Sequence, residues 1–244
     1  MTSGPLTGGI ARRAFQPSLR WTRTCCSKVC PAGLFRCSSN PAAAARLSSL
    51  AQVALKVAAP GVPDIYQGTE LWDLSLVDPD NRRPVDYARR RELLAELARR
   101  ASSGPEARLG LARELIASPA LADGRAKLFL LRESLRFRRA HPALFLDGEY
   151  VPLAIDGEHA NHAVAFARLH EGERFICVVP RLVLQLLDQS GRGQPIAWHG
   201  RVSLPASLRE PLADVVSGRR HTPRDGALGL GELFADFPVA LLAG

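Results

Sequence analysis

The chain has 244 residues, of which 46% are hydrophobic and 23% charged, and its formal net charge is +8. This composition is typical of a globular protein that can bury a core, and no apolar run approaches the roughly 20 residues that a membrane-spanning helix needs. The charge is uneven: residues 1–63 contain eight Lys and Arg but no Asp or Glu, and the other 24 basic residues match the 24 acidic ones. Because the basic excess lies in one segment, it predicts neither a nucleic-acid nor a membrane partner.

The first 43 residues show neither helical nor strand periodicity, and we expect them to form a disordered basic leader. Three interpretations stay open. The Arg and Ser content resembles an organellar transit peptide. The four cysteines at positions 25, 26, 30 and 37 suggest zinc, but they lack the paired two-residue spacing of familiar sites. The lack of any pattern favours an out-of-frame translation upstream of a genuine reading frame. The lone later cysteine, Cys177, is typical of a reducing cytoplasm.

Helical periodicity begins near Ala44 and predicts four helices in the next hundred or so residues. The first helix ends at Pro60-Gly61, and a short apolar strand, Asp64–Tyr66, follows it. Asp86 and Asp123 are expected to cap the second and fourth helices. The last three predicted helices span Tyr87–Ala101, Pro105–Ile116 and Gly124–Ala140.

The periodicity changes to that of strands from about Phe145. Two strand-like runs, Ala163–Leu169 and Phe175–Pro180, are separated by His-Glu-Gly-Glu, which predicts a hairpin turn. Several short strands punctuated by Gly and Pro predict an antiparallel β-sandwich. The further strands are expected near Val202–Leu204, Asp214–Val216, Ala227–Leu230 and Val239–Leu242.

Several motifs carry a resemblance to a known family. The run P-G-V-P-D-I-Y-Q-G-T-E (Pro60–Glu70) resembles the last barrel strand of α-amylase superfamily enzymes. The run D-P-D-N-R-R-P-V-D (Asp78–Asp86) is more particular and resembles malto-oligosyltrehalose synthase. The resemblance continues through Asp123–Leu153 and the runs HAVAFAR, VVPR and FPVALL. It covers about residues 45–244, with the motifs in the same order and at similar spacing.

The resemblance implies a fold for each part of the chain. Residues 44–144 would be the C-terminal end of a (β/α)8 barrel: its seventh helix, its eighth strand, a helical insertion and its eighth helix. Residues 145–244 would be the antiparallel β-sandwich domain that follows the barrel in this superfamily. The fold class is therefore α/β plus β, preceded by the disordered leader at residues 1–43.

The resemblance also implies a reaction. Enzymes of this family convert the reducing-end α-1,4 bond of a maltodextrin, an α-1,4-glucan, into an α,α-1,1 bond, with a carboxylate nucleophile and a second carboxyl group as acid and base. In the superfamily these carboxylates, and a further stabilising one, follow the fourth, fifth and seventh barrel strands, before the matched region. No residue here inherits a catalytic role, so we expect an inactive fragment that needs no cofactor or metal, with the missing barrel half as a partner if it is separately encoded.

One wall of the sugar site would remain, because such barrels place their sites at the C-terminal ends of the strands. Aromatic rings would stack on sugar faces and planar polar groups would bind hydroxyls. Four of the candidates also have a structural alternative: core packing for the tyrosine, packing of the insertion helices for the tryptophan, and mutual pairing of the aspartate and the arginine. The candidate substrate-binding residues are Tyr66, Gln67, Trp72, Asp80, Asn81 and Arg82.

The sequence also offers a second possible site and a second possible function. Four acids, Glu70, Asp73, Asp78 and Asp80, lie on one loop but have no pocket that would shift the pKa of a catalytic pair; Glu70 is expected to order the loop. The alternative function is a stand-alone module that binds carbohydrate or a partner protein without catalysis.

Overall fold

The computed structural model describes residues 41–73, 82–117, 120–191 and 193–244, which all belong to one compact unit. The predicted leader and its four cysteines lie outside the described residues, except for Pro41–Ala43. These three residues form the first turn of helix α1, so helix replaces the expected disorder there. Among the described residues, no helix is long and apolar enough to cross a membrane.

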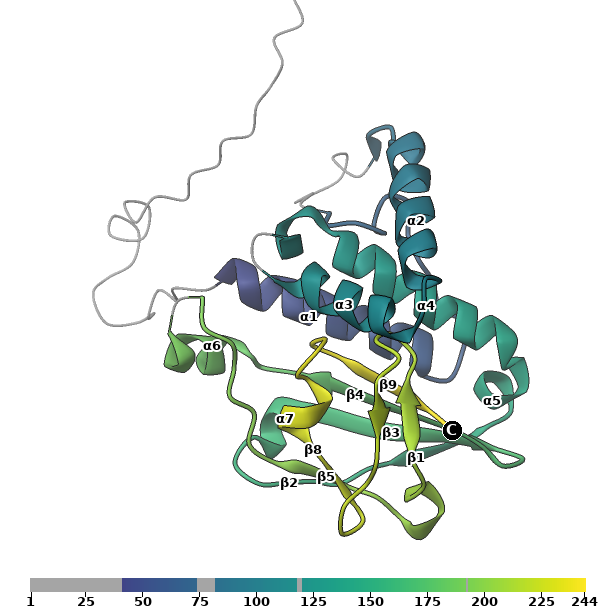
Figure 1. Cartoon of the computed structure of the whole chain (residues 1–244), viewed down its shortest axis with the longest axis vertical. Helices are drawn as coiled ribbons and strands as arrows, with labels where there is room; N and C mark the ends of the chain where they lie inside the picture. The colour runs from purple at the N-terminus through teal and green to yellow at the C-terminus, as the bar shows by residue number, and fades with distance from the viewer. Residues whose placement is uncertain (1–40, 74–81, 118–119, 192) are drawn as a thin grey trace, which may run out of the picture. The chain divides into compact units, whose positions relative to one another are not determined.

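The four predicted helices are present with nearly the predicted bounds (Figure 1). Asp86 caps the second helix as predicted, because its side chain accepts a hydrogen bond from the Arg89 N–H at 2.9 Å. The cap residue of the fourth helix is Gly124, in the left-handed region at φ 85°, while Asp123 accepts from the Arg125 N–H instead. The helices are α1 (Pro41–Ala58), α2 (Tyr87–Ala101), α3 (Pro105–Ile116) and α4 (Arg125–Ala140).

The predicted strand Asp64–Tyr66 is absent: these residues run between α1 and α2 without forming a strand. The physical reason is the lack of neighbours. A parallel barrel strand needs hydrogen-bonded strands on both sides, and no other described segment pairs with this one. The helices expected for this part of the chain are present without that strand, and their place at the end of a barrel stays a prediction.

The C-terminal part contains two antiparallel sheets, as the strand pattern predicted. The six-stranded sheet has the order β1-β3-β4-β9-β6-β7, and the three-stranded sheet has the order β2-β5-β8. Strands β1, β2 and β7 and the short helices α5, α6 and α7 were not predicted. The strands are β1 (Glu149–Pro152), β2 (Ile155–Asp156), β3 (Ala163–His170), β4 (Glu173–Pro180), β5 (Arg201–Ser203), β6 (Leu212–Asp214), β7 (Arg220–His221), β8 (Ala227–Gly229) and β9 (Ala240–Ala243). The short helices are α5 (Pro142–Leu146), α6 (Leu184–Ser190) and α7 (Leu230–Leu233).

The predicted hairpin turn joins β3 to β4 in register, pairing His170 with Glu173. Its two central residues, Glu171 and Gly172, have φ values of 45° and 91°. Two successive positive φ values give the twist that a two-residue hairpin needs, and glycine adopts this conformation at little cost.

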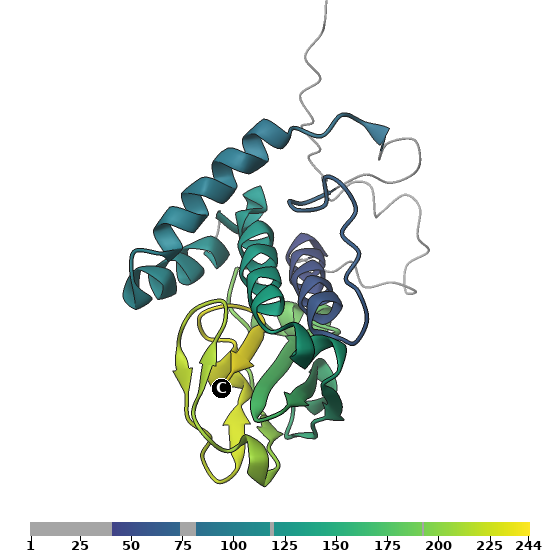
Figure 2. The same ribbon diagram turned by 90° about the vertical axis from the view of Figure 1, so that its right-hand side faces the viewer.

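Both faces of the six-stranded sheet are buried, each against a different layer. Successive side chains of a strand point to opposite faces. In β4, Phe175 and Cys177 join the apolar cluster shared with the helices, whereas Ile176 and Val178 join the cluster shared with the three-stranded sheet. Figure 2 shows α1 and α4 side by side on the helical side of the sheets. The core thus runs across the predicted boundary between residues 144 and 145, and the division into two domains stays a prediction.

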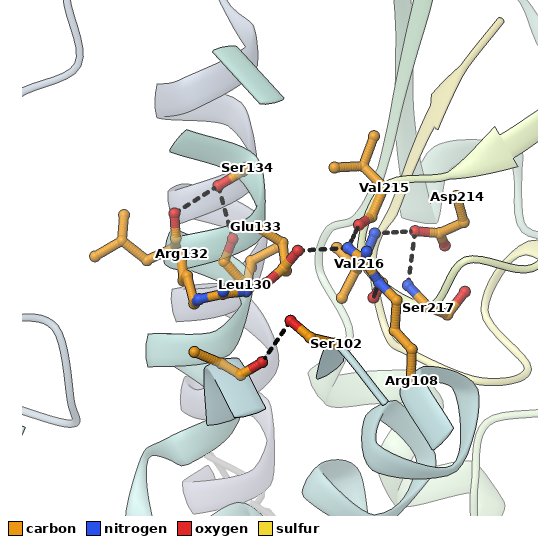
Figure 3. Close-up of polar contacts among 12 residues, drawn as sticks. Ser102, Arg108, Leu130, Arg132, Glu133, Ser134, Asp214, Val215, Val216 and Ser217 are labelled. Carbon is orange, nitrogen blue, oxygen red and sulfur yellow. Dashed lines mark hydrogen bonds and ion pairs between the residues drawn. The ribbon is translucent and has the colours of Figure 1, made fainter. Parts of the chain in front are cut away.

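A polar contact also joins the helical layer to the sheets (Figure 3). Arg108 of α3 reaches the turn after β6, where its Nε donates to the Val216 carbonyl at 2.9 Å and its Nη2 donates to the Val215 carbonyl. The same Nη2 forms an ion pair with Glu133 of α4, whose side chain is almost fully buried. One guanidinium therefore ties α3 and α4 to the large sheet. This suits arginine, which presents five donors in a rigid plane.

Asp214, at the end of β6, is a buried carboxyl group close to this contact. Its Oδ1 accepts hydrogen bonds from the N–H groups of Val216 and Ser217 at 2.6 and 3.2 Å. Burial raises the pKa of Asp214 to about 6, although these hydrogen bonds and the charge of Arg108 act in the opposite direction. Loss of solvation disfavours the charged carboxylate more than its partners favour it.

We predict that Asp214 makes the protein less stable as pH rises from about 4 to about 6. The unfolded aspartate has a pKa near 3.9, so the folded state holds a proton that the unfolded state releases in this range. The shift to about 6 corresponds to a loss of about 3 kcal/mol. Asp214→Asn keeps an Oδ1 acceptor and should remove this dependence. Urea unfolding at pH 4 and pH 7 measures it, and parallel pH profiles of wild type and variant would refute it.

The two-sided sheet gives a second prediction, on neighbouring positions of β4. Phe175→Ala opens a cavity against the helices, and Ile176→Ala opens one against the second sheet. Both should lower the free energy of unfolding by about 2–5 kcal/mol, the range for large buried side chains. Urea unfolding compares the two variants. If the helices were a detachable layer, Phe175→Ala would cost far less than Ile176→Ala.

Candidate functional site

The candidate site lies in the segment between α1 and α2, of which residues 59–73 and 82–86 are described. Here Tyr66 and Gln67 begin a tight turn and are both exposed, Tyr66 by 49%. The Tyr66 carbonyl accepts hydrogen bonds from the Thr69 N–H at 3.1 Å and the Thr69 Oγ1 at 2.6 Å. Gly68 has φ 87°, a conformation that favours glycine. Two predicted sugar-contacting residues are thus presented together by one turn, which we call the Tyr66 turn (residues 66–69).

Arg90 of α2 binds this turn through hydrogen bonds and an ion pair. Its Nη2 donates to the Gly68 carbonyl at 2.8 Å, and its Nε forms an ion pair with Glu70 at 2.8 Å. Its Nη1 donates to the carbonyl of Asp86, the helix cap, at 3.1 Å. Glu70 therefore orders the loop, as the sequence indicated, and its carboxylate is engaged in an ion pair.

The beginning of the segment is fixed to the helices as well. Lys56 of α1 donates to the Asp64 carbonyl at 2.7 Å. Arg138 of α4 donates to the Val57 and Gly61 carbonyls at and just beyond the end of α1, where a positive charge suits the helix dipole. The path of residues 58–64 is consequently set by two cations from two helices.

Trp72 is partly buried, and its indole N–H donates to the Leu121 carbonyl at 2.8 Å. A Cβ on Gly124 would lie 2.9 Å from the Trp72 backbone nitrogen, so the start of α4 needs glycine there. Lys127 lies 5.8 Å from the centre of the indole ring and donates to the Leu71 carbonyl at 3.4 Å; burial lowers the pKa of this lysine. Trp72 therefore contacts the residues just before and at the start of α4, and both its packing against the insertion helices and its contact with a sugar stay predictions.

The other predicted residues are not all within the described chain. Asp80 and Asn81 lie outside the described residues, as does Asp78, while Arg82 is described and exposed. Among the described residues, no group of three or more His, Cys, Asp or Glu side chains is placed to hold a metal ion. The sugar-binding roles of Tyr66, Gln67 and Arg82 stay predictions.

The sequence did not identify Arg90 as the side chain that braces the turn. Arg90 is one of three consecutive arginines in α2, so composition does not distinguish it. The signal that could have found it is helical spacing, because Arg90 is four residues after the cap Asp86 and lies on the same side of the helix.

A separate cavity of about 500 Å³ lies beside the N-terminal end of α1. Its lining is mainly apolar and includes two aromatic residues, Trp198 and Phe234, whose ring centres are 4.9 Å apart. Of the predicted sugar-contacting residues that the structure describes, none lines it. Polar groups enter its wall from Arg46 and Gln194.

No family model matches the chain. Two curated relatives from Mycobacterium tuberculosis strains, each named as a maltooligosyl trehalose synthase, are 38% identical over 199 residues, which is 81% of this chain and 20% of the relative. The structure of the maltooligosyltrehalose synthase from Arthrobacter ramosus is 38% identical and covers 82% of this chain and 22% of its own, with a TM-score of 0.61. A further maltooligosyl trehalose synthase structure is 25% identical and covers 81% of this chain and 21% of its own, with a TM-score of 0.54.

The chain thus spans about a fifth of the length of the relatives that it matches. Both the sequence identity and the structural likeness extend over about four fifths of the chain itself. The resemblance indicated by the motifs from Pro60 onward is therefore confirmed: the chain is similar to the C-terminal region of maltooligosyl trehalose synthase.

Proposed function

We propose that this chain is the C-terminal end of a maltooligosyl trehalose synthase and that residues 61–73 form one wall of its sugar site. The observation that carries the proposal is the Tyr66 turn. It presents an aromatic ring and an amide to solvent, while Arg90 fixes the backbone behind them. A sugar offers apolar C–H groups on its ring face and hydroxyls on its edge, which suits an aromatic side chain next to a planar polar group.

The segment before the turn suits the last strand of a barrel. Residues 62–65 make no backbone hydrogen bond to another described segment. Apart from the Asp64 carbonyl, which accepts from Lys56, their backbone polar groups are open to a neighbouring strand. They leave α1 and lead to the turn, as a strand does between a barrel helix and its active-site loop. In the proposal, the part of the relatives that this chain does not match supplies the neighbouring strands.

The proposed reaction divides between the two parts. A carboxylate of the unmatched part attacks the anomeric carbon, the terminal α-1,4 bond breaks, and the general acid protonates the leaving oxygen. The released glucose stays bound, its anomeric hydroxyl attacks the same carbon, the carbon–carboxylate bond breaks, and the hydroxyl proton goes to the base. In the proposal, this chain binds the sugar and keeps water out of the site. It is inactive alone in this proposal, because no matched residue inherits a catalytic role.

The alternative is a carbohydrate-binding or partner-binding module without catalysis. The cavity beside α1 favours this alternative, because Trp198 and Phe234 line it together with Arg46 and Gln194, apart from the Tyr66 turn. The two functions differ in a measurable way: the module binds maltooligosaccharide as the isolated chain, whereas the synthase end acts only when the barrel is complete.

The first test is a chimera in which residues 45–244 replace the matching C-terminal part of the Arthrobacter ramosus enzyme. Isomerisation removes the reducing end of maltopentaose, so the loss of reducing sugar reports the reaction. We expect no loss with the 244-residue chain alone and clear loss with the chimera. A chimera that is folded by circular dichroism but inactive would refute the proposal, as would activity of the chain alone.

The second test concerns Tyr66 in this chimera. An aromatic contact contributes about 0.5–1.5 kcal/mol, so Tyr66→Ala should raise KM for maltopentaose roughly 2- to 10-fold. The matched control is Tyr150→Ala on β1, because the two tyrosines are similarly exposed, by 49% and 45%. Steady-state kinetics compare the variants. Equal KM values for Tyr66→Ala and Tyr150→Ala would remove Tyr66 from the sugar site.

A further inference from the structure

Arg90 joins three backbone or side-chain acceptors from two parts of the chain. The Gly68 carbonyl and the Glu70 carboxylate belong to the site segment, and the Asp86 carbonyl belongs to the cap of α2. The guanidinium is mostly buried, with 18% of the side chain exposed. A rigid planar group with one donor for each acceptor fixes their relative positions, which a flexible ammonium does less well.

Val85, just before the helix cap, adds a packing contact to the same place. A Cβ on Gly68 would lie 3.2 Å from Val85 Cγ2, so the turn already lies close against the N-terminal end of α2. Polar and apolar contacts from residues 85–90 therefore converge on the peptide units of the Tyr66 turn. Within the turn itself, only the two hydrogen bonds from Thr69 to the Tyr66 carbonyl close the backbone.

Helix α2 is in turn anchored to the rest of the fold. Arg100, near its end, forms an ion pair with Glu114 of α3, and Arg108 of α3 reaches the carbonyls after β6. The position of the Tyr66 turn is thus connected through α2 and α3 to the large sheet, and Arg90 is the contact that completes this connection at the turn.

We propose that Arg90 is a positioning residue: it holds the Tyr66 turn against α2 so that Tyr66 and Gln67 cover the sugar and exclude water. This inference rests on the proposed function. Its chemical consequence is specific. When the turn loosens, water instead of the retained glucose attacks the anomeric carbon; the carbon–carboxylate bond breaks, a carbon–oxygen bond to water forms, and the proton goes to the general base. The products are glucose and a shortened maltooligosaccharide.

The first experiment uses the whole 244-residue chain and needs no sugar. Hydrogen exchange of the Thr69 N–H, which bonds the Tyr66 carbonyl, measures how well the turn is closed. Arg90→Ala should increase its exchange rate at least tenfold, and Arg90→Lys should increase it less. The control is Arg91→Ala, an exposed arginine of the same helix, which should leave the rate unchanged. Exchange in β3 and β4 should be equal in all four proteins.

The second experiment measures how the chimera divides its reaction between isomerisation and hydrolysis. In Arg90→Ala, the glucose released per isomerised, non-reducing product formed should rise several-fold, and Arg90→Lys should restore part of the original ratio. A general loss of folded enzyme lowers both products together and leaves this ratio unchanged. Arg91→Ala again serves as the control.

The outcomes separate the two proposals. Unchanged Thr69 exchange in Arg90→Ala overturns the positioning role, whatever the chimera does. If Arg90→Ala increases Thr69 exchange but leaves the product ratio of an active chimera unchanged, then Arg90 holds the turn but the turn does not exclude water. This outcome also overturns the proposal. An inactive wild-type chimera refutes the proposed function, and the inference about water exclusion falls with it, while the exchange data still decide whether Arg90 holds the turn.

Discussion

The burial of both faces of the six-stranded sheet is the constraint on which the rest of the structure depends. Strand β4 passes through the middle of this sheet, and its alternate side chains belong to two separate apolar clusters. One cluster needs α1 and α4, and the other needs the three-stranded sheet. Because exposing either face would return large apolar side chains to water, the helices that flank the candidate site cannot be treated as an appendage to a β-sandwich.

Three arginines connect the packed core to the candidate site. Arg108 ties α3 to the sheet, Arg138 binds carbonyls at the end of α1, and Arg90 binds the Tyr66 turn. Each uses several donors of one guanidinium to join backbone carbonyls that no regular secondary structure satisfies, which also meets the hydrogen-bonding needs of those carbonyls. An irregular segment is thereby given a defined position, although residues 61–73 contain neither helix nor strand.

Local patterns in the sequence predicted the long elements and failed for elements that depend on distant partners. Helices α2 and α3 were predicted with their observed bounds, since capping, proline at a helix start and apolar spacing are local signals. The two-residue strands β2 and β7 are too short for a period to show, and β2 exists through pairing with the distant strand β5. Asp64–Tyr66 had the composition of a strand without a partner, which is why the prediction was wrong here.

The candidate site was predictable only in part, because local patterns do not specify contacts with distant residues. Tyr66 and Gln67 were found through a motif, and their exposure on one turn follows from Gly68 and Thr69 nearby. The contacts that hold the turn come from residues about 20 positions away, which no local pattern specifies. The chain spans about one fifth of its relatives' length, and the described contacts that hold the Tyr66 turn all lie within it. Order at the turn depends on the sheet and the arginines, and both lie within this chain.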